Sequence, residues 1–176
     1  MYAYTHISSG LIMKCYILFI KIKCKRGERI LIKKVIVALD GSDSANQALD
    51  LALDVAEKYS ADILLLSIFH PYLSLIRSNN LTIEEIRPYL EKQKAYHEKV
   101  LSEALKKVNR LKPNLKVSTK LKEGRPADKI IETAKEGNFD LIVMGNLGIG
   151  GVTELLLGSV SDRVADHAPC AVLIVK

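Results

Sequence analysis

The 176-residue sequence has few of the side chains that hold metals or form disulfides. Its three cysteines, Cys15, Cys24 and Cys170, are too few and too irregularly spaced for a disulfide framework or a zinc site. The four histidines are scattered along the chain and show no metal-ligand spacing. We therefore expect no metal centre built from these residues, and we expect reduced thiols in a cytoplasmic protein.

The sequence also lacks the common signatures of catalysis. It contains no G-x-S-x-G nucleophile elbow, no H-E-x-x-H segment and no pair of catalytic carboxylates. No G-x-x-x-x-G-K-[ST] segment is present, so no lysine is placed for a γ-phosphate. The G-x-G-x-x-G dinucleotide pattern fails because Thr153 takes its third glycine position after Gly148 and Gly150. Nothing in the chain predicts covalent or acid–base catalysis.

Long hydrophobic runs and a broad basic surface are absent as well. The apolar run Leu11–Ile22 is interrupted by Lys14 and Lys21, is too short to span a bilayer and lacks the flanks of a signal peptide. The net charge of +6 comes from residues 1–34, which carry eight basic residues and one acidic residue. The remainder has 18 basic and 19 acidic residues. We expect no nucleic-acid binding and no stable membrane insertion.

The chain divides into an N-terminal extension, residues 1–32, and one domain, residues 33–176. The domain is long enough to bury a substantial core. The extension has three interpretations: an added strand or arm, a weak membrane-surface anchor, or non-native sequence from an upstream start codon. We favour the last, because a complete domain pattern begins only at Ile32.

Strand and helix patterns alternate through the domain. Apolar or alternating runs predict five strands, at residues 33–39, 62–69, 115–121, 139–144 and 170–175. Helices are predicted between them, and two begin with capping boxes, Ser44 with Gln47 and Thr82 with Glu85. Five strands separated by helices predict an α/β fold with a parallel, doubly wound sheet and right-handed crossovers.

The segment from Phe139 to Val160 is the most informative about function. Its apolar run ends at Gly145, a glycine-rich turn follows, and Gly158-Ser159 begins a helical pattern. A strand that stops in a glycine loop before a helix suits phosphate binding, because backbone N–H groups and the positive helix end attract an anion. Ser159 adds a hydroxyl donor there, or serves only as an N-cap in a capping box with Asp162.

Asp40 follows the first predicted strand and is the second candidate. In a doubly wound sheet, ligands bind beyond the carboxyl ends of the strands, where the strand order reverses. If strands 33–39 and 139–144 are neighbours, Asp40 and the glycine segment face one crevice. Asp40 then accepts hydrogen bonds from a ribose, lies near a metal, or is only a turn aspartate.

These residues resemble the ATP-binding subclass of single-domain universal stress proteins. The spacing Gly145-x2-Gly148-x9-Gly158-Ser159 is similar to the nucleotide-binding signature of that family. The segment VIVALDGSDSANQALDLAL resembles its first strand and helix, and EGRPADKIIETAKEGNFDLIVMG resembles the segment before the signature. The resemblance runs from Lys33 to the C-terminus.

The resemblance implies a five-stranded parallel sheet of order 3-2-1-4-5 with helices on both faces, the adenine nucleotide alpha hydrolase-like fold. It implies ATP as the ligand, alone or with Mg²⁺ or Mn²⁺, and a homodimer that pairs strands 170–175. Eight residues would surround the nucleotide: Asp40 by the ribose or metal, Ile68 by the adenine, Met144 and Gly145 by base and ribose, and Gly148, Gly158, Ser159 and Val160 by the triphosphate.

Three functions remain open at this point. The glycine segment without a catalytic residue set favours a homodimeric ATP-binding stress-response regulator with little or no hydrolysis. An adenylating enzyme is the alternative, because Gly41-Ser42-Asp43-Ser44 resembles the end of the S-G-G-x-D-S loop of N-type ATP pyrophosphatases. That loop would have Ser and Gly where this chain has Leu39 and Asp40. The third is a family member that binds no nucleotide and acts through dimerisation.

Overall fold

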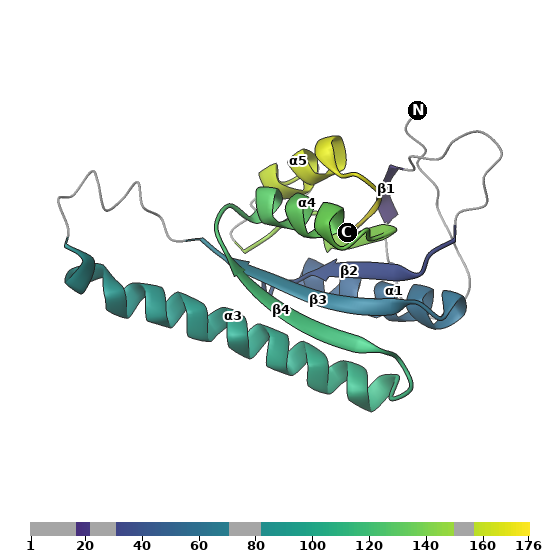
Figure 1. Ribbon diagram of the computed structural model, residues 1–176, viewed down its shortest axis with the longest axis horizontal. Coiled ribbons are helices and arrows are strands. Elements are labelled where there is room, and N and C mark those ends of the chain that lie inside the picture. Colours follow the sequence, from purple (N-terminus) through teal and green to yellow (C-terminus); the bar gives the residue numbers. More distant parts are fainter. Residues whose placement is uncertain (1–16, 22–30, 71–81, 150–156) are drawn as a thin grey trace.

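The computed structural model describes residues 17–21, 31–70, 82–149 and 157–176, which form one sheet with helices on both faces (Figure 1). In chain order the elements are β1 (Ile17–Lys21), β2 (Lys34–Ala38), α1 (Asp43–Tyr59), β3 (Asp62–Phe69), α3 (Ile83–Leu111), β4 (Val117–Glu123), α4 (Pro126–Glu136), β5 (Leu141–Gly145), α5 (Ser159–His167) and β6 (Ala171–Val175).

The sheet confirms the predicted fold class and adds one strand to it. Its order is β1-β6-β5-β2-β3-β4, so the five parallel strands β2 to β6 follow the predicted order 3-2-1-4-5. Strand β2 lies at the centre, where Ile36 pairs with Leu64 of β3 and with Ile142 of β5. The strand order therefore reverses between β2 and β5, which places a ligand crevice at their carboxyl ends.

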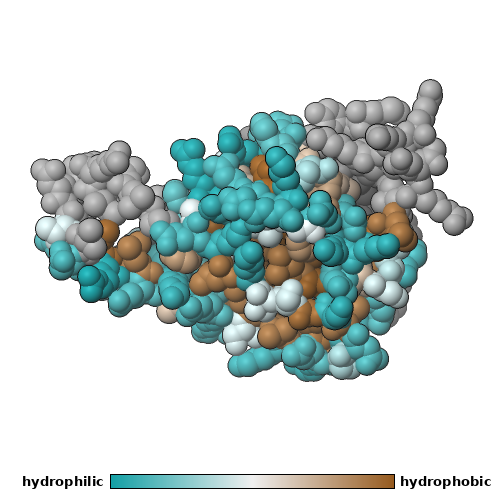
Figure 2. Space-filling view, in the orientation of Figure 1, coloured by the Kyte–Doolittle hydropathy of each residue, from teal (hydrophilic) through white to brown (hydrophobic). Residues whose placement is uncertain are grey.

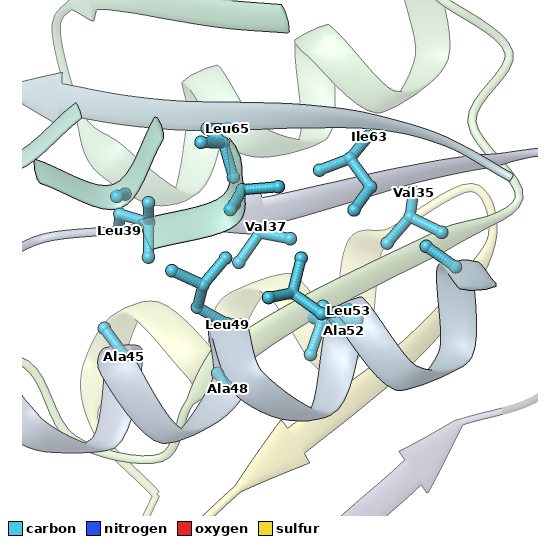
Figure 3. Close-up of a cluster of buried hydrophobic side chains, with 14 of the residues drawn as sticks. Val35, Val37, Leu39, Ala45, Ala48, Leu49, Ala52, Leu53, Ile63 and Leu65 are labelled. Atoms are coloured by element: carbon cyan, nitrogen blue, oxygen red, sulfur yellow. The ribbon is translucent and has the colours of Figure 1, made fainter. Parts of the chain in front are cut away.

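Two hydrophobic cores hold the helices on the sheet. Because side chains alternate along a strand, Val35 and Val37 of β2 face α1 and α3, whereas Ile36 faces α4 and α5. Figure 3 shows Leu49 and Leu53 of α1 packed against these valines. Burial on both faces explains why the strand sequences are continuous apolar runs rather than alternating ones.

Local capping differs from the predictions at two of three helix starts. The Thr82–Glu85 capping box of α3 is confirmed. The N-cap of α1 is Ser42 and not Ser44, because Ser42 Oγ accepts the Ala45 N–H at 3.3 Å. The N-cap of α5 is Gly158, so Ser159 is the first helical residue and the predicted capping box with Asp162 is wrong.

Strand β4 begins two residues later than predicted. Leu115 N donates to Lys112 O at 3.1 Å, so Leu115 still belongs to the turn that follows α3.

In Figure 2, hydrophobic side chains gather over β3 and β4 in the middle of the visible face, bordered by hydrophilic ones. Within the described residues β4 pairs only with β3, and its central residues 118–120 are exposed.

Strand β1 pairs antiparallel with the outer edge of β6, from Ile17 opposite Val175 to Lys21 opposite Val172. Residues 17–21 of the extension therefore form an added strand, the first of the three interpretations. Residues 1–16 and 22–30 lie outside the described residues, and the native or non-native origin of the extension stays a prediction. No helix among the described residues is both long and apolar enough to cross a bilayer.

Candidate functional site

A cavity of about 840 Å³ opens at the carboxyl ends of β2, β3 and β5, where the strand order reverses. Its volume is within the range of small-molecule sites, roughly 300–1,000 Å³. All eight residues predicted from the sequence line this cavity, so Asp40 and Ser159 share one rim although they are far apart in the chain. Residues 150–156 of the glycine segment, including Gly150 and Gly151, lie outside the described residues.

Gly145 brings the end of β5 against the start of α1. A Cβ atom at this position would lie 2.8 Å from the Ser44 carbonyl carbon and 2.9 Å from Ala45 N, distances that real Cβ atoms essentially never show. Only glycine permits this close approach of two backbones. The contact joins the carboxyl ends of β2 and β5 into one rim of the cavity.

The Asp40 carboxylate links the turn after β2 to the glycine segment. Its Oδ1 accepts hydrogen bonds from Ser42 N at 2.9 Å and Ser42 Oγ at 2.6 Å. Its Oδ2 accepts the Ile149 N–H at 3.1 Å. Asp40 is thus a turn aspartate, and it also orders the first part of the glycine segment.

A second link runs through Ser44, whose hydroxyl donates to Leu147 O at 2.5 Å. The hydroxyl group mispredicted as an N-cap is used instead to hold the glycine segment against α1. Asn146 ties the two ends of the segment together: its N–H donates to Val175 O at 2.8 Å, and its carbonyl accepts the Gly158 N–H at 2.9 Å.

The start of α5 points an uncapped helix end toward the cavity. Gly158, Ser159 and Val160 line the cavity, and no side chain caps the helix at Gly158. The first N–H groups of a helix have no partner inside the helix, and together with the helix dipole they attract an anion. This end of the cavity is suited to phosphate groups.

Another part of the cavity lining is apolar. Ile68 of β3 is 7% exposed and Met144 of β5 is 5% exposed. Further apolar lining comes from Ala38 of β2 and from Pro126 and Ile130 of α4. A flat ring would bury its largely apolar faces against these side chains.

Helix α3 contributes four lining residues that the sequence reasoning missed: Tyr89, Gln93, Tyr96 and His97. Their spacing of four, three and one places them on one helical face, which is the signal that could have found them. Tyr96 Oη donates to the backbone carbonyl of Asp40 at 3.3 Å. His97 Nδ1 lies 2.8 Å from Ser67 Oγ. Burial lowers the pKa of His97, and the negative charge of Asp40 partly opposes this.

Charged groups are scarce around the cavity. None of the described lining residues is a lysine or an arginine, and Asp40 is the one carboxylate among them. The described parts of the chain hold no group of three or more His, Cys, Asp or Glu that could bind a metal ion. An anionic ligand would therefore be held mainly by backbone N–H groups.

A parallel sheet with helices on both faces, and with a cavity, a glycine segment and an open helix start at its switch point, defines the class of doubly wound α/β domains. The chain belongs to the universal stress protein family, whose model matches residues 31–176. The sheet is the adenine nucleotide alpha hydrolase-like fold.

Individual relatives agree with this assignment. The universal stress protein MJ0531 of Methanocaldococcus jannaschii is 35% identical over 170 residues, covering 94% of this chain and 93% of the relative. YxiE of Bacillus subtilis, also a universal stress protein, is 34% identical over 152 residues, covering 81% and 98%. A universal stress protein solved in complex with cAMP superposes with a TM-score of 0.62 at 27% identity, covering 83% of this chain and 98% of that one.

Proposed function

We propose that this protein is a stress-response regulator that binds ATP in the cavity with little or no hydrolysis. The observation that carries the proposal is the pairing of an apolar pocket with an uncapped helix start in one cavity. An adenine nucleotide has the matching pair of groups, a ring and a chain of phosphates. The relative solved with cAMP supports an adenine nucleotide as the ligand class.

Each lining residue then has a role. Ile68 and Met144 contact the adenine, and Gly145 lets the ribose approach the backbone. Asp40 contacts the ribose or a metal beside it. The triphosphate lies along Gly148, Gly158, Ser159 and Val160, held by N–H groups and the Ser159 hydroxyl.

A divalent cation fits this arrangement in one way only. Asp40 is the single carboxylate lining the cavity among the described residues, and three hydrogen bonds already engage it. Mg²⁺ or Mn²⁺ would therefore bind mainly to the phosphates and to water, and Asp40 would be a protein ligand only where its last acceptor position is not used by the ribose. Mg²⁺ commonly binds in this way, through one or two carboxylates plus substrate phosphates.

Little hydrolysis is expected, because phosphoryl transfer depends on positive groups that stabilise the developing charge. The described lining residues supply none from lysine or arginine. The adenylating alternative has weaker support. In the stretch that resembles the pyrophosphatase loop, the Ser42 hydroxyl donates a hydrogen bond to Asp40 and the Ser44 hydroxyl donates one to Leu147 O. Both hydroxyl protons are therefore already used within the protein. Release of pyrophosphate with a candidate substrate would favour that alternative.

Equilibrium titration with a fluorescent ATP analogue and with ATP itself, in the presence of Mg²⁺, tests the proposal. A Cβ at Gly158 would lie 3.1 Å from Asn146 O, so Gly158→Val should displace the phosphate-binding turn and weaken binding at least tenfold. Thr119→Val, which also introduces a branched apolar side chain but on exposed β4, is the control and should bind normally. No binding by the unmodified chain up to millimolar ATP rejects the proposal. The protein would then act without nucleotide, through dimerisation.

The proposal includes a cytoplasmic location and a homodimer through residues 170–175. In the single chain, β1 covers the outer edge of β6, so this dimer requires β1 to leave that edge. The double substitution Phe19→Pro/Ile20→Pro removes two backbone donors from β1 and should release it. By light scattering, the proline variant, in which β1 no longer competes for this edge, should form the dimer at lower protein concentration than the unmodified chain; a monomeric variant argues against this interface.

A further inference from the structure

His97 has one ring nitrogen that the fold engages and one that it does not. The ring lines the cavity from α3 and is 8% exposed. Within the described parts of the chain, its hydrogen bonding involves only Nδ1, which lies 2.8 Å from Ser67 Oγ. His97 Nε2 is not among the fully buried atoms that lack a partner in the described parts of the chain, so it is accessible, and an accessible ring nitrogen at a ligand cavity is a candidate contact for the ligand.

The hydrogen bonds of Ser67 fix which nitrogen carries the proton. Ser67 has a single hydroxyl proton, and its Oγ lies 2.6 Å from the Leu39 carbonyl, which can only accept. Ser67 therefore donates to Leu39 and accepts from His97 Nδ1–H. In the neutral ring, which burial favours by lowering the pKa of His97, Nε2 then carries a lone pair. It can accept a hydrogen bond but cannot donate one.

Asp40, on the same cavity wall, has little acceptor capacity left. A carboxylate offers about four acceptor positions, two on each oxygen. Ser42 N and Ser42 Oγ occupy both positions on Oδ1, and Ile149 N occupies one on Oδ2. Asp40 can therefore accept one more hydrogen bond, whereas the two neighbouring hydroxyls of a ribose offer two donors.

We propose that His97 Nε2 is the second acceptor, so that Asp40 and His97 together recognise the 2′ and 3′ hydroxyls of a ribonucleotide. This inference rests on the proposed nucleotide binding and adds selectivity for ribose over deoxyribose. Ser67 is a positioning residue in this arrangement, because it sets the tautomer that leaves Nε2 as an acceptor.

Calorimetric titration of the full-length protein with ATP, 2′-deoxy-ATP and 3′-deoxy-ATP tests the inference. The analogue that lacks the hydroxyl bound to His97 Nε2, a neutral acceptor, should bind about three- to tenfold more weakly than ATP, and the analogue that lacks the hydroxyl bound to the charged Asp40 carboxylate about ten- to 150-fold more weakly. In His97→Asn the amide N–H can still donate to Ser67 Oγ, but nothing remains at the position of Nε2. The variant should therefore bind ATP no more tightly than it binds the analogue that lacks the hydroxyl assigned to His97. It should still bind ATP more tightly than the analogue that lacks the hydroxyl assigned to Asp40.

The outcomes separate this inference from the proposed function. If the unmodified protein binds ATP and both analogues equally, the recognition of ribose is wrong, and this result needs no variant to fold. If His97→Asn keeps both preferences, the second acceptor is not His97. Failure of the unmodified protein to bind ATP at all rejects the proposed function instead.

Discussion

The contact between Asp40 and the Ile149 N–H predicts that Asp40→Asn loosens the glycine segment in the absence of ligand. The amide oxygen of asparagine can still accept both hydrogen bonds from Ser42. Its NH₂ group then faces the Ile149 N–H, so a 3.1 Å hydrogen bond to a charged oxygen becomes a contact between two donors. The lost interaction is local, because it joins Asp40 to a single amide of the segment.

The size of the effect follows from this one bond. A hydrogen bond to a charged group contributes about 1.5–3 kcal/mol, and the half-buried position of Asp40 favours the lower end. We expect the free energy of unfolding to fall by about 1.5 kcal/mol, which lowers Tm by roughly 3–6 °C in a domain of this size. Thermal unfolding followed by circular dichroism measures the loss, and hydrogen exchange should be faster at the Ile149 amide.

The control is Asp62→Asn, which removes the same charge at the start of β3. Asp62 forms an exposed ion pair with Lys116 at 3.5 Å, so its loss should change the free energy of unfolding by less than about 0.5 kcal/mol. An Asp40→Asn protein as stable as the Asp62→Asn protein, with unchanged exchange at Ile149, would refute the reasoning.

The remaining predictions concern the core, the rim and the buried histidine. Leu49→Ala should lower the free energy of unfolding by about 2–5 kcal/mol in urea titrations, because Leu49 is fully buried. The control, Leu51→Ala, changes a partly buried leucine on the same helix and should lower the free energy of unfolding clearly less. Equal losses would contradict the assigned packing. Gly145→Ala should cost about 1–3 kcal/mol by forcing α1 from β5, and an unchanged Tm would show that the close approach is not needed. Because burial lowers the pKa of His97 from its usual value of 6.5, the unfolded chain takes up a proton below about pH 6.5 before the folded chain does. The free energy of unfolding should therefore fall as the pH is lowered from 6.5 to the pKa of His97 in the folded protein, by at most about 1.4 kcal/mol per pH unit. Above pH 6.5 this residue should cause no change in the free energy of unfolding. Asp40 and Tyr96 face the ring, and His97→Asn should remove this part of the slope; a slope that persists in the variant belongs to other groups.

Much of the fold could be predicted because it depends on local patterns. The runs of β2 and β5 are apolar at every buried position on both faces, and glycine or proline marks most of the element ends. The cavity followed from topology, since the neighbouring parallel strands β2 and β5 place Asp40 and the glycine segment at one edge of the sheet. Whether these residues bind ATP stays a prediction.

What could not be predicted depends on contacts between distant segments. Ser42 and Ser44 are equally good N-caps locally, and the choice is made by Leu147, whose carbonyl takes the Ser44 hydroxyl. The lining residues of α3 were missed because its apolar pattern, from Val100 to Val108, describes only the half that packs on the sheet. The other half passes the carboxyl ends of the strands, as Figure 1 shows. The apolar spacing within a helix does not show how far the helix extends past the strands on which it packs.

Strands β1 and β4 form the two margins of the described sheet, and this bears on how the protein can polymerise. A sheet with two open margins could add copies at both and grow into a fibre. Here one margin ends in the antiparallel β1, and the other ends in β4, which carries the exposed Lys120. Charged residues on an edge discourage a further strand from docking. Should β1 detach, two copies could join edge to edge about a two-fold axis, and such an assembly would be self-limiting at two chains.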